Sequence, residues 1–469
     1  MNLDEKVEAL FRRYRREAVL LDRIWPPFAG PVGRSKFGGL PNLPEHYDWP
    51  RAPERGVPLH FLAQIDCAEI PFPSPLPDRG MLFFFARDDY EQLWGFDGDP
   101  AEDCRVIHAL DAFGNTPPRE PPPDLPPIGD EWGRSTYWDV AMGDPPRPRG
   151  PGPKLHVEWP LRLYRMESWP DPSGLPEQLE EADAAWRRFL SAFRFGRSDA
   201  AELQNQDVYD RYLDLVDAKR AQAIAAATGR PLPRGLRDDR DAAARIFRHR
   251  AGGDGEFPER WITVEWFARH VLARYKPERA DEAEARAAAA TDEAALGWLR
   301  RARAASAEGL VPAEARRELR SWLLSLDPPR PPGVDPDLPG FYASRWIVGA
   351  VEWTIRTWAA DRERAALVPE EHHAAVELFL APNIVQPSSD RQGRPEDAFQ
   401  LQWAQMLGHA PSAQEARPAD DPTICLLNLE SDGGVPWMFA DVGQATFWIA
   451  PADLARRDFS RVALGIEGH

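Results

Sequence analysis

The spacing of apolar and polar residues changes twice along this chain. From about residue 25 to 169, short apolar runs alternate with proline, glycine and aspartate, which is the pattern of β-strands joined by turns. From about 175 to 381, apolar residues recur with helical spacing among Ala, Glu, Arg and Leu. After about residue 394 the short apolar runs return. The pattern therefore predicts two β-rich ends around a helical middle.

The individual runs predict the following elements. Strands are expected at 59–65, 81–86, 104–110, 154–164, 424–430, 436–440, 445–450 and in the last segment, RVALGIE. Helices of the middle region are expected near 177–195, 199–228, 238–250, 262–275, 280–306, 312–326, 341–362 and 369–380. Two further helices are expected outside it, at 395–407 and at 3–21, where Leu3, Val7, Leu10, Tyr14 and Leu21 share an apolar face.

These elements predict an α+β fold in which the two ends form one β-rich domain and the mostly α-helical middle is inserted into it. Insertions are tolerated at exposed loops because the entropy of loop closure rises slowly with loop length. We expect an N-terminal helix within residues 1–24, a two-part α+β domain at 25–197 and 391–469, and a helical insertion at 198–390.

Composition narrows the class of protein. The 469 residues are 43% hydrophobic, as in globular proteins, and the net charge of −18 argues against a general binder of nucleic acid or anionic membranes. Three cysteines, distant from one another, indicate free thiols in a reducing compartment. The N-terminus lacks the pattern of a signal peptide, and no apolar run reaches the roughly 20 residues that span a bilayer. We therefore expect a soluble cytoplasmic protein and leave its oligomeric state open.

Both β-rich ends carry linked motifs. The first end contains GRSKFGGLPNLPEHYDWP (33–50) and then PLHFLAQIDCAEIP (58–71). The second end contains LLNLESDGGVPWMFADVGQATFWIAPADLARRDFSRV (426–462). In this order the motifs resemble the YwqG-like family, a mainly bacterial group described as a domain of unknown function. The resemblance covers roughly 25–170 and 395–469 and leaves the helical middle without a counterpart.

The resemblance implies an α+β fold with an internal β-rich duplication and a place in the bacterial cytoplasm. It implies no established catalytic site. The family occurs near secreted-toxin genes in some genomes, which suggests a partner-binding or immunity-type role. His409 stands where the family often has a tyrosine.

Four residues of the first end are candidates for a binding site, each with a structural alternative. Gly38 and Gly39 either let a ligand approach the backbone closely or form a tight turn with positive φ. Lys36 either contacts an anion or is a solvated surface lysine. Gln64 lies within an apolar strand, where a buried amide either lines a pocket or hydrogen-bonds a loop backbone.

Four residues of the second end complete the candidate set. Asp432 and Asp441 lie in expected turns, where carboxylates cap the backbone by default, or bind a metal or share a proton when brought together. Trp437 and Trp448 belong to expected strands whose aromatic residues divide between the core and an exposed binding patch. The sequence alone does not bring these residues together.

No motif identifies an enzyme, a metal site or a cofactor. The run EEHHAAVE (370–377) lacks the HExxH arrangement, and neither GxSxG nor a phosphate-binding P-loop is present. We therefore assign no catalytic residue, no metal and no cofactor, and favour a non-catalytic protein that binds a protein partner or a small ligand. Two alternatives stay open: an enzyme of unrecognised type with a pocket near the Gly38–Gly39 turn, and an immunity-type protein that neutralises a toxin.

Overall fold

The structure is a computed structural model. It describes residues 9, 12–25, 34–88, 104–112, 116–128, 154–171, 174, 218–229, 260–273, 282–305, 309–325, 386–387, 399–400, 403–412, 416–431, 435, 439–440 and 443–468. These ranges include much of both β-rich ends and several helical stretches of the middle region.

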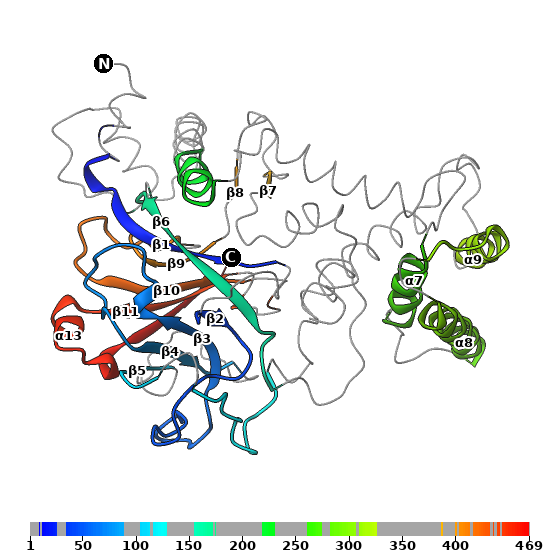
Figure 1. The fold of residues 1–469 in the computed structure, drawn as a ribbon, viewed down its shortest axis with the longest axis horizontal. Coiled ribbons are helices and arrows are strands. Elements are labelled where there is room, and N and C mark those ends of the chain that lie inside the picture. The colour runs from blue at the N-terminus through cyan, green and yellow to red at the C-terminus, as the bar shows by residue number, and fades with distance from the viewer. Residues whose placement is uncertain are drawn as a thin grey trace, which may run out of the picture.

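The two ends of the chain form one ten-stranded antiparallel sheet (Figure 1). Its strand order is β12-β11-β10-β9-β1-β6-β2-β3-β4-β5. The strands are β1 (Arg16–Arg23), β2 (Lys36–Phe37), β3 (His60–Asp66), β4 (Met81–Ala86), β5 (Cys104–Ala109), β6 (Trp159–Ser168), β9 (Ala404–Leu407), β10 (Ile424–Glu430), β11 (Gln444–Ile449) and β12 (Ala463–Glu467). A separate two-stranded ribbon pairs β7 (Gln386–Pro387) with β8 (Phe399–Gln400). The expected α+β fold class is therefore confirmed.

The centre of the sheet is the pair formed by β1 and β6. Their register runs from Arg16 opposite Ser168 to Arg23 opposite Leu161. The other edge of β1 pairs with β9, which belongs to the second end of the chain. A strand near the N-terminus therefore joins two segments that are far apart in sequence.

The position of β1 corrects the helix predicted at 3–21. Residues 9 and 12–14 are helical, but Arg16–Arg23 is a strand. Every residue from 18 to 21 is 0% exposed, so this run is buried on both faces of the sheet. Because a helix at the surface buries only one stripe, a continuous apolar run of this kind belongs to a central strand.

The short helix predicted at 395–407 is also wrong. Residues 399–400 form β8 and residues 404–407 form β9, which pairs with β1 and β10. Of the predicted strands, 154–164 begins later, at Trp159, and residues 439–440 of the 436–440 strand are not in a strand. The remaining strand predictions are confirmed by β3, β4, β5, β10, β11 and β12.

Strands on the two sides of the central pair follow one another in the same way. On one side the order is β6-β2-β3-β4-β5, and on the other side it is β1-β9-β10-β11-β12. Each side is one long strand followed by four antiparallel strands that are consecutive in sequence. This mirrored order supports the internal duplication that the family resemblance implies.

The sheet curls until its two sides share one apolar core. Phe84 of β4 packs edge-on against Phe447 of β11, with ring centroids 5.3 Å apart. At the open side, β5 lies against the 3-10 turn η5 (Phe459–Arg461), where the His108 ring contacts Phe459. Burying a side chain of phenylalanine size contributes about 2 kcal/mol. The apolar contacts across the interior therefore hold the sheet in its nearly closed form.

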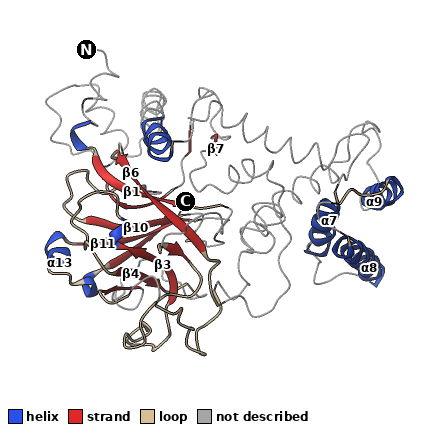
Figure 2. Cartoon of the chain, in the orientation of Figure 1, coloured by secondary structure: helices blue, strands red, loops and turns tan. Residues whose placement is uncertain are grey.

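Helices of the middle region match their predictions where they are described. α7 (Trp261–Ala273), α8 (Glu282–Ala304) and α9 (Ala313–Ser325) correspond to the helices predicted at 262–275, 280–306 and 312–326, and residues 218–228 are helical. We call α7, α8 and α9 the helical group, since they share a small apolar core that includes Val264, Trp298 and Leu319. Figure 2 shows the helical group to one side of the sheet, and Phe267 of α7 belongs to the same apolar cluster as the core of the sheet. The helices predicted at 177–195, 238–250, 341–362 and 369–380 lie outside the described residues.

One short helix, α13 (Pro451–Ala455), follows β11. Within the described ranges, no helix combines the length and the apolar character that crossing a bilayer requires.

The turn after β2 generates a prediction about stability. Gly38 has a φ of +55°, and a Cβ added there would lie 2.2 Å from the carbonyl oxygen of Val157. Gly56 has a φ of +68°, but nothing lies within 4 Å of its added Cβ. We expect Gly56→Ala to cost about 1 kcal/mol of unfolding free energy for the positive φ, and Gly38→Ala to cost at least about 2 kcal/mol more. Urea unfolding followed by tryptophan fluorescence measures both losses, and equal losses would contradict the close approach at Gly38.

Candidate functional site

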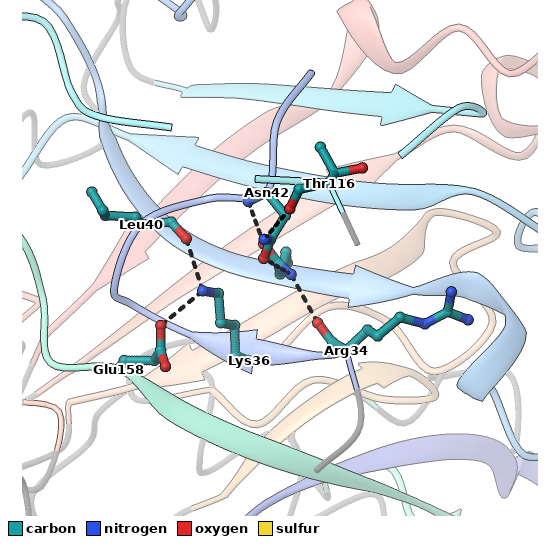
Figure 3. A network of polar contacts seen from close by, with 7 residues as sticks. Arg34, Lys36, Leu40, Asn42, Thr116 and Glu158 are labelled. Atoms are coloured by element: carbon teal, nitrogen blue, oxygen red, sulfur yellow. Dashed lines mark hydrogen bonds and ion pairs between the residues drawn. The ribbon is translucent and has the colours of Figure 1, made fainter. Parts of the chain in front are cut away.

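The turn after β2 brings together four of the eight candidate residues (Figure 3). Lys36 lies opposite Gln64 in the β2–β3 ladder, and Gly38 and Gly39 follow β2 directly. Both glycines have positive φ, and the Gly39 amide donates a hydrogen bond to the carbonyl of His156. The two glycines therefore form a tight turn pressed against the segment that leads into β6.

Gln64 is buried and uses its whole side-chain amide within the fold. Its Oε1 accepts from the Asn42 backbone amide at 2.9 Å, and its Nε2 donates to the Arg34 carbonyl at 2.8 Å and to the Asn42 Oδ1 at 2.9 Å. Asn42 in turn donates to the carbonyl of Thr116 at 2.7 Å, as Figure 3 shows. The amide thus fastens the loop after the glycine turn to β3. Both amide hydrogens are engaged, which matches the structural alternative for this residue.

Lys36 is held in the same network. Its Nζ donates to the carbonyl of Leu40 at 2.7 Å and to the carboxylate of Glu158 at 2.8 Å. The Lys36 side chain is only 13% exposed. The lysine is therefore neither a solvated surface residue nor an uncompensated cation, because its charge is balanced by Glu158.

A second turn of the same form follows β9. Leu407 and Gly408 have φ of 62° and 68°, as Gly38 and Gly39 have 55° and 67°. A Cβ added at Gly408 would lie 2.5 Å from the Cβ of Ser168 at the end of β6. Each half of the sheet therefore carries two successive positive-φ residues that lie close to the central strand pair.

The two turns are closed by equivalent side chains. Gln405 lies opposite the buried amide of Asn428, as Lys36 lies opposite Gln64. The Gln405 Nε2 donates to the carbonyl of His409 at 2.9 Å, four residues ahead. Lys36 makes the same bond, also four residues ahead, to Leu40. A neutral amide and a charged amine thus do the same structural task in the two halves.

His409 is buried at the end of the second turn. Its Nε2 donates to the carbonyl of Tyr14 at 2.6 Å, and its backbone amide donates to the Ser168 hydroxyl at 2.8 Å. Burial, assisted by the neighbouring charges of Arg16 and Arg220 and opposed by the hydrogen bond to the Tyr14 carbonyl, lowers the pKa of His409 to about 4. The imidazole is therefore neutral at neutral pH.

A buried histidine–aspartate cluster beside the first turn was not predicted from the sequence. The His60 Nδ1 accepts from the Asp88 backbone amide at 3.2 Å, so its Nε2 carries the hydrogen and donates to the Pro126 carbonyl at 3.0 Å. The His156 Nε2 lies 3.0 Å from the Asp88 Oδ2, and both side chains are buried. In the sequence, the residues of this cluster are recognisable only as polar residues at the borders of apolar runs. Many ordinary loops carry such residues, so this pattern does not identify the cluster.

The candidate residues of the second end do not join this site. Trp448 lies on β11, which four strands separate from β2 in the sheet. The Arg417 guanidinium lies over the Trp448 ring, 4.4 Å from its centroid, so part of this aromatic surface is covered. Asp432, Trp437 and Asp441 lie outside the described residues.

The thiols of Cys67 and Cys425 are poor nucleophiles. Cys67, Cys104 and Cys425 are all buried, and none of them forms a disulfide. Burial raises the pKa of Cys67 to about 12 and raises the pKa of Cys425 as well. Since the thiolate is the reactive form, Cys67 and Cys425 are inert at neutral pH. Across the described residues, no group of three or more His, Cys, Asp or Glu side chains is arranged to hold a metal ion.

The mirrored, curled sheet defines an α+β domain assembled from both ends of the chain. A family model, the domain of unknown function DUF1963, matches residues 35–218 and 355–467, which is more than half of the chain. The chain therefore belongs to this family. The helical group lies in the unmatched stretch between the two segments, so the family domain is interrupted by an insertion. A search of curated proteins finds no match.

The amide network predicts the effect of substitution at Gln64. Gln64→Leu removes the partners of the Asn42 amide and the Arg34 carbonyl, and each buried polar group left without a partner costs about 1–3 kcal/mol. We expect the unfolding free energy to fall by at least about 2 kcal/mol. Lys36→Gln is the matched control, because Gln405 already makes the equivalent bond in the second half, and we expect a loss within about 1 kcal/mol. Urea unfolding measures both, and a Gln64→Leu protein as stable as the wild type would refute the structural role.

The pKa of His409 predicts a dependence of stability on pH. Its pKa is about 4 in the folded chain against 6.5 as its ordinary value, so between these limits the unfolded chain binds a proton that the folded chain does not. The unfolding free energy therefore falls as the pH is lowered, by about 2 kcal/mol from this residue between pH 7 and 5. In His409→Gln this part of the slope should vanish. Urea unfolding at the two pH values measures it, and identical slopes in both proteins would contradict the assignment.

Proposed function

We propose that this chain is a non-catalytic binding protein whose ligand is another protein. The proposal rests on how the polar candidates are used. Lys36 and Gln64, the groups beside the glycine turn on which an unrecognised enzyme would depend, are engaged in hydrogen bonds within the fold. The turn therefore offers a rigid structure rather than available acid–base groups.

The compartment and the family support the same proposal. Three buried cysteines, none of them in a disulfide, favour a reducing compartment, which we infer to be the bacterial cytoplasm. The motifs that resemble the YwqG-like family suggest partner binding, and an immunity-type role is the narrower form of it in which the partner is a toxin. A small ligand remains the second kind of occupant to be tested.

An enzyme is the competing function, and one observation favours it. The His156–Asp88 pair joins an imidazole to a carboxylate, as in sites of general acid–base catalysis. Both side chains are buried, however, and the backbone around them is used to hold the Gly38–Gly39 turn. We therefore interpret the pair as structural.

Capture of a partner by the whole chain tests the proposal. The immobilised full-length protein is exposed to a lysate of its native host, and an unrelated acidic protein serves as control. We expect one protein to be retained in a stoichiometric complex that survives gel filtration and is displaced by free chain. A His156→Gln variant that stays folded should retain it equally, because the binding surface does not include the buried pair.

Two results would overturn the proposal. One is a wild-type chain that retains no protein while native mass spectrometry of the purified protein shows a bound small molecule. The other is a folded His156→Gln protein that loses turnover of such a molecule, which would favour the enzyme.

A further inference from the structure

We propose that a proline-rich segment on the surface of the sheet domain binds an aromatic-lined groove of the partner protein. The segment, called here the proline strap, consists of residues 117–127 and has the sequence PPREPPPDLPP. Seven of its eleven residues are prolines, and none of the eleven belongs to a helix or a strand. This inference rests on the proposed function and names the surface and the chemistry of the partner.

The first six residues of the proline strap have the composition of a polyproline II helix. Proline fixes φ at about −65° and drives the residue before it into an extended conformation. Every residue of 117–122 except Arg119 is a proline or precedes one. The Leu125 amide donates to the Pro122 carbonyl at 3.0 Å, which closes a turn and ends the extended stretch. The stretch therefore spans two turns of a helix that has three residues per turn.

Burial along this stretch follows the same period of three. Arg119 and Pro122 share one face of such a helix, and both are half-buried. Pro117 and Glu120 share a second face, and both are exposed. One face of the stretch therefore rests on the protein while another is presented to solvent.

The outer side also keeps its hydrogen-bond acceptors. Pro118 is exposed, and Pro121 stands three residues further on, as in ligands of the PxxP type. In the part of the chain that the structure describes, no group donates a hydrogen bond to the carbonyls of Pro117, Pro118, Glu120 or Pro121. Aromatic grooves that bind polyproline II helices pack proline rings against their own rings, and tryptophan and tyrosine also supply hydrogen-bond donors. The outer side of the proline strap offers a groove of this kind both contacts.

Arg119 fastens the extended stretch from its inner face. Its backbone amide donates to the Pro41 carbonyl at 2.8 Å. Its guanidinium donates to the Pro44 carbonyl at 3.4 Å and to the Tyr47 carbonyl. These bonds use the one residue of the stretch that neither is a proline nor precedes one, so the exposed prolines take no part in the anchor.

The second half of the proline strap is fastened as well. Arg51 holds the Asp124 carboxylate through two hydrogen bonds of 2.8 and 2.9 Å, and the His60 Nε2 donates to the Pro126 carbonyl at 3.0 Å. Leu125 is only 1% exposed. Because folding already orders the extended stretch, a partner does not have to order it on binding, and this preorganisation favours affinity.

A matched pair of double variants tests the inference in the full-length chain. Pro117→Ala with Pro118→Ala removes two exposed rings of the proline strap. Pro71→Ala with Pro73→Ala removes two exposed prolines between β3 and β4, outside the strap. Since all four rings are exposed, we expect both variants to unfold at nearly the urea concentration that unfolds the wild type.

The probe is the partner captured by the wild-type chain, and a synthetic peptide of residues 116–124 serves as competitor. We expect the strap variant to bind this partner at least about tenfold more weakly and the other variant to bind it like the wild type. The peptide should displace the partner, and the same peptide with Pro117→Ala and Pro118→Ala should not. Prolines that only stiffen the loop would change the unfolding midpoint and leave partner binding unchanged.

The outcomes separate this inference from the proposed function. If the wild type and both variants bind the captured partner equally, or if the peptide does not displace it, this inference falls and the proposed function stands. If both variants lose binding to the same extent, the loss is not specific to the proline strap, and the inference falls again. If the wild-type chain captures no protein, the inference and the proposed function fall together.

Discussion

The pairing of β1 with β6 and β9 is the constraint on which the rest of the structure depends. β1 comes from the N-terminal end, β6 closes the first half of the sheet and β9 opens the second. Once this strand is in place, β9 is held whatever the length of chain between β6 and β9, because the entropy of closing a loop grows only slowly with its length. The central strand thus explains how one domain contains the helical group within it.

The turns at Gly38–Gly39 and Leu407–Gly408, one in each half of the sheet, pack against the central strands. In both turns, residues with positive φ let the backbone approach the central strands. The side chain of Lys36 in β2, or of Gln405 in β9, donates a hydrogen bond to the carbonyl four residues ahead. Lysine and glutamine serve equally as the donor, which means that the charge of Lys36 is not what the turn requires. A repeated structural device of this kind accounts for motif residues that otherwise suggest a binding site.

The sequence predicted the parts of this structure that depend on local pattern. β10 and β11 follow from apolar runs bounded by turn residues, and α7 to α9 follow from helical periodicity. β1 and β9 were not predicted, because their partners lie far away in the chain and burial on both faces overrides a helical pattern. Gln64 was recognised as unusual, but its role depends on where Asn42 and Arg34 come to lie. The His60, Asp88 and His156 cluster depends on the same distant pairings.

Polar side chains are used differently in the sheet and in the helical group. Within the described part of the family domain, the buried polar side chains around the turns hydrogen-bond to one another and to nearby carbonyls. These hydrogen bonds contribute to the stability of the fold. The helical group lies in the stretch that the family model does not match, and it directs Arg300 and two leucines to solvent instead. The sheet therefore carries these stabilising hydrogen bonds, whereas the exposed side chains of the helical group retain their capacity for new contacts.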